Sequence, residues 1–341
     1  MNYVFTPEKV FFQEDSLSYP LGQKLYSSFK SKGIPIKIMK SIRITSLSEK
    51  TPEERYRQAK RILAVTVKKS LRFATCKPSA HFQLPLSTSC PGRCEYCYLQ
   101  TTLGTQPYLR VYVNLDQVLQ KAQEHIESRA PRVTLFEASA TSDPVALEPW
   151  TNSLYKVIQY FGKQRYGKLR FVTKFTGVDT LIKAKHNGNT HIRFSLNSDK
   201  VIKNHEKGTP PLHQRLEAAQ KIARAEYPLG FILAPLLIYP GWEKDYRTLL
   251  EVIKKKITSY EKSNLTFELI THRFTKRAKN IILERFPGSQ LQMEESKRQF
   301  KWGQFGYGKY LYLPEEREKI KSFFLENIEE LFPEAHVEYF I

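Results

Sequence analysis

The stretch CPGRCEYCY, residues Cys90–Tyr98, decides how the rest of the chain is interpreted. It holds three of the four cysteines, at a C-x3-C-x2-C spacing, and no histidine lies within eight residues of them. Three thiolates this close on one loop can hold three corners of a cubane iron–sulfur cluster, whereas a structural zinc site needs a fourth protein ligand. We therefore expect Cys90, Cys94 and Cys97 to ligate a [4Fe-4S] cluster whose fourth iron is open to a ligand that is not protein.

Three plainer interpretations of the loop stay open: a zinc knuckle, an electron-carrier cluster, or three buried free cysteines. Tyr96, an aromatic residue, stands directly before the last cysteine. With it, the loop resembles the signature of the radical S-adenosylmethionine (SAM) enzymes. The resemblance implies that the amino and carboxylate groups of SAM chelate the open iron. It also implies that one electron from the reduced cluster cleaves SAM to methionine and a 5′-deoxyadenosyl radical.

The charge balance points to a polyanionic partner. Lys and Arg number 54 against 34 Asp and Glu, a formal net charge of +20. We expect nucleic acid first and an anionic membrane surface a distant second. The hydrophobic fraction of 41% supports a substantial core. There is no apolar run of membrane-spanning length, no signal-peptide pattern at the start and no disulfide framework, so we expect a cytoplasmic protein with no membrane partner.

Strand and helix patterns alternate between residues 82 and 285. The expected strands are Phe82–Ser87, Arg132–Ser139, Leu169–Phe175, His191–Asn197, Leu229–Leu237 and Leu265–His272. The expected helices are Asn114–Ser128, Trp150–Phe161, Val178–Lys185, Pro211–Ala225, Lys244–Ser259 and Lys276–Arg285. Six βα units in succession predict an α/β fold with a parallel sheet and crossover helices, either open or curled into a partial barrel.

Two further regions flank this alternation. Residues 1–83 are expected to form a basic N-terminal α/β extension, with helices at Gly22–Lys32 and Pro52–Ile62 and a short β run at Leu63–Val67. Residues 84–286 form the predicted barrel, and residues 287–341 a C-terminal β-hairpin and helix for DNA contact. Cys76 stands apart from the other cysteines, so we interpret it as an ordinary thiol and not as a metal ligand.

The carboxyl ends of parallel strands are where ligands bind in α/β folds. Small hydroxyls, an amide and a lysine follow the predicted strands here, as a polar, zwitterionic nucleoside cofactor requires. The expected cofactor-binding residues are Ser142, Lys174, Ser195, Asn197 and Ala234. Each of them taken singly is better explained as a helix cap or a turn residue, whereas the set as a whole favours a binding site.

The segment Lys297–Tyr310 interleaves basic residues, aromatic residues and three glycines. It predicts a β-hairpin that exposes aromatic side chains for stacking on bases beside cations for phosphates. An ordinary hairpin with its aromatics in a core is the alternative. The expected DNA-binding residues are His272, Arg273, Lys301, Trp302, Phe305, Tyr307 and Lys309. A helix at Pro314–Phe332 and an apolar tail at Val337–Ile341 are expected to close the chain.

Most of the chain resembles the spore photoproduct lyase family. The resemblance rests on Cys94–Gly104, Leu169–Phe175, Phe267–Lys276 and Lys301–Tyr310. It implies a partial (β/α)6 barrel of the radical SAM type and the substrate 5-thyminyl-5,6-dihydrothymine, a thymine-dimer lesion that is flipped out of DNA.

The same resemblance implies a mechanism and partners. The deoxyadenosyl radical abstracts hydrogen from C6 of the lesion, the bond between the two thymines breaks, and SAM is re-formed at the end. Tyr98 or Tyr96 beside the cluster relays the hydrogen atom that the product radical must regain. The implied partners are lesion-bearing DNA and a flavodoxin- or ferredoxin-like electron donor. The protein is expected to be a monomer, in the spore core of spore-forming bacteria.

Two positions depart from the family pattern. The family carries its hydrogen-donor cysteine directly before Thr-Ser-Asp, where this chain has Ala140 before Thr141–Asp143. We interpret the alanine as an engineered substitution and predict an impaired variant that leaves by-products at the thymine methyl. The chain also has Glu137–Ala140 where many radical SAM enzymes have Gly-Gly-Glu for the SAM amino group, so that role passes to Ser142, Lys174, Ser195 and Asn197.

Two other functions share the cysteine loop and the basic charge. One is a radical SAM enzyme that acts on RNA, such as a nucleoside modifier. The other is a nucleic-acid-binding protein with a structural iron–sulfur cluster.

Overall fold

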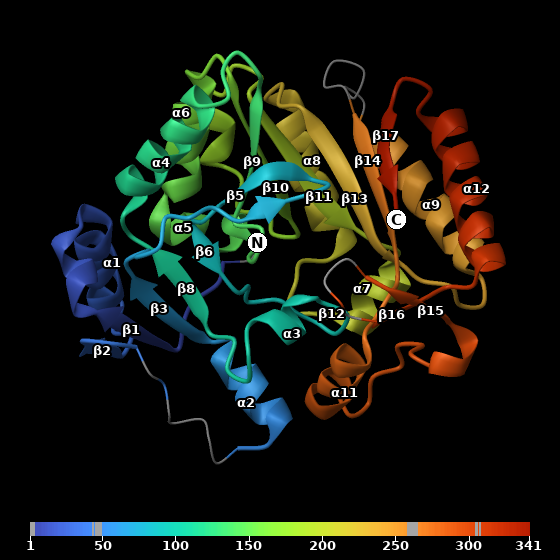
Figure 1. Cartoon of the computed structure of the whole chain (residues 1–341), viewed down its shortest axis with the longest axis horizontal. Coiled ribbons are helices and arrows are strands. Elements are labelled where there is room, and N and C mark those ends of the chain that lie inside the picture. Colours follow the sequence, from blue (N-terminus) through green and yellow to red (C-terminus); the bar gives the residue numbers. More distant parts are fainter. Residues whose placement is uncertain (1–3, 43, 45–49, 258–264, 304–305, 307) are drawn as a thin grey trace. The chain divides into compact units, whose positions relative to one another are not determined.

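The computed structural model describes residues 4–42, 44, 50–257, 265–303, 306 and 308–341 (Figure 1). The chain forms two compact units. The first comprises residues 1–91 and 105–192, and the second residues 92–104 and 193–341. Each unit is described by itself below.

The first unit contains a five-stranded sheet with the order β2-β1-β3-β8-β6. Its strands are β1 (Lys9–Gln13), β2 (Ile36–Met39), β3 (Ile62–Thr66), β6 (Ser87–Thr88) and β8 (Leu109–Tyr112). β6 is antiparallel to β8, and the other neighbours are parallel. Helices α1 (Pro20–Ser31) and α2 (Pro52–Ala59) belong to this part of the chain. Thr51 and Glu54 form the capping box that begins α2, so the expected helix start is correct.

A buried apolar cluster supports this sheet. Phe12 and Val65 from the strands pack with Phe29 of α1 and with Trp150, which lies far along the chain. The rings of Phe29 and Trp150 are 4.6 Å apart, and the Trp150 indole donates a hydrogen bond to the Phe5 carbonyl at 2.6 Å. The N-terminal sheet is therefore packed against the segment that contains Trp150.

The first unit also carries the first strands of the predicted barrel. They are β4 (Thr75–Cys76), β5 (Ala80–Leu84), β9 (Thr134–Ala138) and β10 (Gly167–Thr173), with β11 (Thr190–Leu196) at the division between the units. The helices between these strands are α4 (Leu115–Glu127), α5 (Glu148–Thr151) and α6 (Ser153–Gly162), and 3₁₀ turns lie at Pro144–Leu147 and Leu181–Lys183. A further 3₁₀ turn, Glu14–Ser18, follows β1 near the start of the chain.

The second unit holds the remaining elements. In chain order they are β7 (Arg93–Cys94), α3 (Leu99–Thr102), α7 (Asp199–His205), β12 (Glu206–Lys207), α8 (Leu212–Arg224), β13 (Leu229–Leu236), α9 (Trp242–Lys256), β14 (Thr266–Thr271), α11 (Lys276–Arg285), a 3₁₀ turn at Glu295–Lys297, β15 (Gln299–Trp302), β16 (Gly308–Leu311), α12 (Pro314–Leu331) and β17 (His336–Phe340). β12 is antiparallel to β7, and β15 is antiparallel to β16 as the hairpin prediction required.

The main sheet confirms the α/β prediction. Its strand order is β17-β14-β13-β11-β10-β9-β5-β4. The six strands predicted from the sequence are neighbours in chain order, and the pairs β5–β9, β9–β10 and β13–β14 are parallel. An order that never reverses is typical of barrel-like sheets, whereas doubly wound sheets reverse at a switch point.

Three expected elements differ in the structure. Val178–Lys185 is not an α-helix but holds a 3₁₀ turn at Leu181–Lys183. Val178, Leu181 and Ala184 are buried three residues apart, which matches the 3₁₀ repeat. The expected helix Trp150–Phe161 is two helices, because Asn152 adopts a left-handed conformation (φ 53°). The apolar tail is strand β17, whose Val337 pairs with Phe267 of β14.

Among the residues that the structure describes, no helix combines the length and the apolarity needed to cross a lipid bilayer.

Candidate active site

In the first unit, the ends of β5 and β9 lie together just before the cysteine loop. The Ser89 amide donates a hydrogen bond to the Thr141 carbonyl at 2.8 Å, and the Ser142 hydroxyl donates to the Ser89 carbonyl. The buried Lys60 ammonium donates to the Ser89 hydroxyl at 3.0 Å and to the Cys90 carbonyl at 2.9 Å. The turn that contains Ala140 and Ser142 is therefore held against the residue that precedes Cys90.

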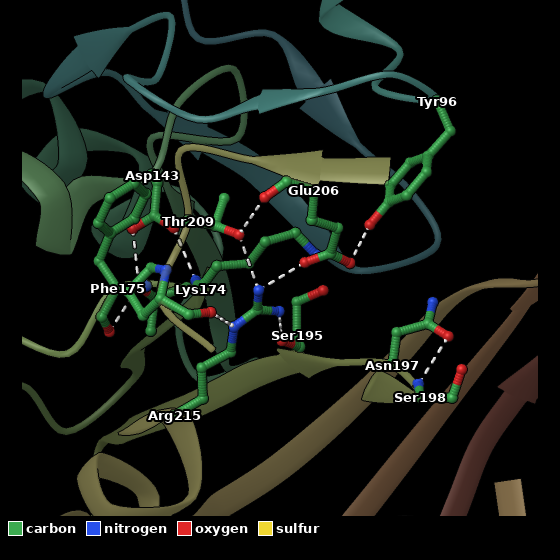
Figure 2. A network of polar contacts seen from close by, with 12 residues as sticks. Tyr96, Asp143, Lys174, Phe175, Ser195, Asn197, Ser198, Glu206, Thr209 and Arg215 are labelled. Atoms are coloured by element: carbon green, nitrogen blue, oxygen red, sulfur yellow. Dashed lines mark hydrogen bonds and ion pairs between the residues drawn. The ribbon is translucent and has the colours of Figure 1, made fainter. Parts of the chain in front are cut away.

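Asp143 joins the end of β9 to the end of β10 (Figure 2). Its carboxylate accepts hydrogen bonds from the Thr173 hydroxyl and the Lys174 amide, both at 2.7 Å, and from the Val145 amide at 3.2 Å. Burial nevertheless outweighs these donors and raises the pKa of Asp143 to about 6. The structure thus brings the predicted residues Ser142 and Lys174 to adjoining strand ends. Asp143, which was not among the expected cofactor-binding residues, connects them.

In the second unit, the segment after Arg93 is tied to helix α11. The Gln100 side chain donates to the Cys94 carbonyl at 3.1 Å. Arg285 donates to the Gln100 amide oxygen at 2.7 Å, to the Gln100 carbonyl at 3.0 Å and to the Gly104 carbonyl at 2.7 Å. No local sequence pattern predicts that Arg285 is buried in this role, because its partner Gln100 lies 185 residues earlier in the chain.

Glu95, which lies between two of the cysteines, has its own buried partners. Its carboxylate lies 3.0 Å from the His205 Nδ1 and accepts a hydrogen bond from the Ser289 hydroxyl at 2.7 Å. These hydrogen bonds and the nearby charges lower the pKa of Glu95 despite its burial. A charged carboxylate therefore anchors the middle of the cysteine loop to two later segments of the same unit.

Tyr96 points its phenol at a buried ion pair, which Figure 2 shows. The hydroxyl donates to the Glu206 carboxylate, and Arg215 lies 2.6 Å from the other oxygen of that carboxylate. Burial, followed by the negative charges of Glu206 and Cys94, raises the pKa of Tyr96 well above its ordinary value. The phenol therefore keeps its proton. By contrast, the side chain of Tyr98 is 59% exposed at the start of α3.

Arg215 also organises the ends of neighbouring segments. It donates to the Ser195 carbonyl at 3.0 Å, the Pro210 carbonyl at 2.8 Å and the Thr209 hydroxyl at 2.8 Å. Both Arg215 and Glu206 have fully buried side chains. Sequence reasoning missed this pair, and nothing in the local pattern around either residue distinguishes it from an exposed charge.

The remaining predicted cofactor residues lie at the ends of β11 and β13. The Asn197 amide donates to the Pro235 carbonyl at 2.8 Å and accepts from the Tyr246 hydroxyl at 2.8 Å. Ser195 is buried, and Ala234 is partly exposed on β13. Asn197 therefore joins the two strand ends through both atoms of its amide group. The assignment of Ser195, Asn197 and Ala234 to SAM binding stays a prediction.

The predicted DNA-binding residues differ in how far they are exposed. His272 is buried against Arg298, and burial lowers its pKa to about 3, so the ring is neutral. Lys301 and Lys309 are cross-strand partners in the hairpin. Burial is the main cause that lowers the pKa of Lys309, and the nearby charge of Arg273 is the second. Trp302 is 69% exposed. Phe305 and Tyr307 lie outside the described residues.

The donor chemistry of the loop fits the expected cluster. None of its cysteines is in a disulfide, and Cys94 is buried while the other two are partly exposed. Cys90 belongs to the first unit and the other two cysteines to the second. Within the described parts of the chain, no three His, Cys, Asp or Glu side chains gather as they would around a single metal ion. A cubane cluster places each thiolate on a different iron, so it does not require that gathering.

Comparisons with known proteins identify the family of the chain. A profile of the spore photoproduct lyase family matches residues 5–341. The chain is 46% identical to the spore photoproduct lyase of Bacillus subtilis (strain 168) over 341 residues, which cover 100% of both chains.

Two solved structures are similar over 99% of this chain and 99% of theirs, each at 47% identity. One is spore photoproduct lyase complexed with dinucleoside spore photoproduct, with a TM-score of 0.96. The other, with a TM-score of 0.94, is a mutant with bound AdoMet and the same dinucleoside, with alanine for cysteine at position 140 and cysteine for serine at position 76. The chain therefore belongs to the spore photoproduct lyase family of radical SAM DNA repair lyases.

Proposed function

We propose that the chain converts 5-thyminyl-5,6-dihydrothymine in DNA to two thymines by radical chemistry and regenerates SAM. The observation that carries the proposal is the family match over residues 5–341, which includes the complete cysteine loop. Its support from similar structures is that one relative binds the dinucleoside lesion and another binds AdoMet together with it.

The cofactors are assigned to this chain's own residues. Cys90, Cys94 and Cys97 would hold the [4Fe-4S] cluster, and the expected cofactor residues at the strand ends would bind SAM. When bound and reduced, this pair supplies a 5′-deoxyadenosyl radical that abstracts hydrogen from C6 of the lesion. The rest of the chemistry falls to the protein, which must bind the lesion, exclude water and move a hydrogen atom.

Tyr96 is suited to relay a hydrogen atom. Its phenol keeps its proton because burial raises its pKa, and its hydrogen bond to Glu206 fixes the direction of the O–H bond. In the relay the phenol would give its hydrogen atom, proton and electron together, to the accepting radical and would take another from 5′-deoxyadenosine, while Glu206 holds the ring in position. Tyr98, which is more exposed, is the second candidate for the relay.

DNA binding is assigned to the hairpin and its surroundings. Lys301 and Lys309 are cross-strand partners, and the repulsion between their like charges destabilises the hairpin in the absence of DNA. A phosphate bound between them would remove this repulsion. The indole of Trp302 is available to stack on a base or to fill the gap left by a flipped lesion. Arg273 belongs to the proposed surface, and the assignment of Phe305 and Tyr307, which lie outside the described residues, rests on the sequence alone.

Alanine at position 140 leaves the product thymine radical without its hydrogen donor, because a methyl side chain has no readily abstractable hydrogen. If no other residue replaces the missing donor, the product radical is quenched at the thymine methyl by other reagents. The hypothesis of an engineered, impaired variant predicts such by-products together with loss of SAM recycling.

The proposal is tested on protein reconstituted anaerobically with iron and sulfide. We expect a reduced four-iron electron paramagnetic resonance signal that shifts when SAM is added, and thymine release from a lesion-bearing dinucleotide. No shift would leave a structural cluster. Modification of tRNA without turnover of the lesion would favour the RNA-directed alternative.

A further inference from the structure

Lys60 is a buried cation at the end of helix α2. The residue is 4% exposed, whereas lysines are almost never fully buried unless they are paired. Its ammonium donates to the Ser89 hydroxyl and to the Cys90 carbonyl, which lie 29 and 30 residues later in the chain. The side chain therefore reaches from the N-terminal sheet region to the first residue of the cysteine loop.

The position of Lys60 at a helix end does not by itself explain this burial. A cation near the last carbonyls of a helix is favourable, and the Lys60 ammonium also lies 5.3 Å from the centroid of the Tyr56 ring in α2. Lys32 has the same position at the end of α1, and its ammonium lies 5.9 Å from the centroid of the Trp150 ring. Lys32 is nevertheless exposed. The contacts just before and within the cysteine loop are what distinguish Lys60 from it.

Ser89 adopts a left-handed conformation (φ 64°), which is uncommon for residues other than glycine. Such a conformation persists only where the surroundings determine it. The Ser89 hydroxyl donates to the Pro107 carbonyl at 2.6 Å and accepts from Lys60, and the Ser89 amide donates to the Thr141 carbonyl at 2.8 Å. Of these partners, Lys60 also contacts the next residue. It therefore holds the chain immediately before Cys90 and at the carbonyl of Cys90 itself.

We propose that Lys60 is a positioning residue of the cluster site: it fixes Cys90 for iron binding, and its positive charge raises the reduction potential of the bound cluster. The inference rests on the proposed function, which assigns Cys90 to the cluster. Reduction takes one electron from an external low-potential donor, breaks no bond and adds one negative charge to a site that three thiolates already make negative. A nearby positive charge favours the reduced state, since net charge and hydrogen bonds around a cluster set its potential.

The two hydrogen bonds of Lys60 leave its positive charge in place. Their acceptors are a hydroxyl and a carbonyl, and neither group carries a net charge. Salt screens the interactions of buried charges much less than those of surface charges. Because Lys60 lies between α2 and β3, the N-terminal region would contribute to electron uptake as well as to the fold.

The reduction potential of the cluster is the direct test. It is measured by a redox titration monitored by electron paramagnetic resonance, on anaerobically reconstituted protein without SAM. Lys60→Gln and Lys60→Met are expected to shift the midpoint potential to more negative values, at low and at high salt alike. Lys60→Arg retains the charge and is expected to keep the potential close to that of the unmodified chain. Lys32→Gln is the matched control, and it is expected to leave the potential unchanged.

Circular dichroism of the cluster-free variants and their iron content after reconstitution separate a role in the cluster site from a role in the fold. Neutral variants that keep the fold but do not load the cluster, beside a Lys60→Arg variant that does, would support the proposal. Loss of the fold in both cluster-free neutral variants would overturn it, because Lys60 would then serve the fold alone. An unchanged potential in cluster-loaded Lys60→Gln, or an equal negative shift in Lys60→Arg, would overturn it as well. If the unmodified chain gives no reduced four-iron signal, the proposed function itself fails.

Discussion

The Tyr96 phenol donates its hydrogen bond to Glu206, and the same carboxylate is paired with Arg215 at 2.6 Å. One buried carboxylate thus connects a residue of the cysteine loop to an arginine that holds the end of β11 through the Ser195 carbonyl. A change at Glu206 is therefore expected to act on both the loop and the strand end.

Removing the charge of Glu206 should destabilise the fold. In Glu206→Gln, the fully buried Arg215 loses its counter-ion, and leaving one partner of a buried pair uncompensated typically costs about 3–5 kcal/mol. The free energy of unfolding from urea titration measures the loss. Glu330→Gln is the matched control, because Glu330 pairs with Arg247 at the surface and such pairs contribute about 0–1 kcal/mol. Equal losses in the two variants would contradict the buried-pair argument.

Tyr96→Phe should separate product formation from SAM recycling. The ring is retained and one hydrogen bond to a charged group is lost, at a cost of about 1.5–3 kcal/mol. We expect the variant to form thymine while the amount of 5′-deoxyadenosine released per thymine rises, because the relay is interrupted. Chromatography of both products gives the ratio, and Tyr98→Phe serves as the comparison. An unchanged ratio in Tyr96→Phe would exclude this tyrosine from the relay.

The stability of the fold should decrease as pH rises through the range in which Asp143 ionises. Its folded pKa of about 6 lies above the ordinary 3.8, so the native state binds more protons than the unfolded state between those values. The free energy of unfolding then falls with rising pH, by about 3 kcal/mol for a two-unit shift. Asp143→Asn should flatten this slope in urea titrations from pH 4 to pH 7.5.

Glu148 provides the check on that experiment. Burial raises its pKa to about 7, so it lowers stability in the same direction over an overlapping range. Glu148→Gln should remove its own part of the slope and leave that of Asp143. A slope in Asp143→Asn identical to that of the unmodified chain would show that this carboxyl ionises as readily in the folded state as in the unfolded one.

Trp302→Ala should weaken binding of lesion-bearing duplex DNA without affecting the fold. Base stacking on an aromatic side chain contributes about 1–3 kcal/mol, which corresponds to a 5- to 150-fold increase in Kd. Fluorescence anisotropy at fixed salt measures the Kd. Leu283→Ala, at an exposed apolar residue of α11, should leave it unchanged. An unaltered Kd in Trp302→Ala would assign the hairpin aromatics to another role.

Local patterns were sufficient for the barrel strands but not for the whole sheet system. The six βα units each have their own periodicity and their own turns, so they could be recognised one at a time. Strand β17 could not, because its partner β14 lies some 70 residues earlier and pairing depends on the fold. Of the N-terminal sheet, only the run Leu63–Val67 was predicted, as part of an α/β extension, and it matches β3. The edge strand β6 is only two residues long and leaves no periodicity to recognise.

The sequence by itself determined the spacing of the three cysteines, the family and the absence of a cysteine at position 140, since each is a property of consecutive residues. Tertiary structure alone decided which charged and polar side chains work together. Asp143 bonds to Thr173 and Lys174, Glu206 to Tyr96, and Arg285 to Gln100, and each contact joins segments that are distant in the chain. Backbone hydrogen bonds between strands and contacts between buried side chains set proximity independently of chain distance, so no local pattern identifies these partners.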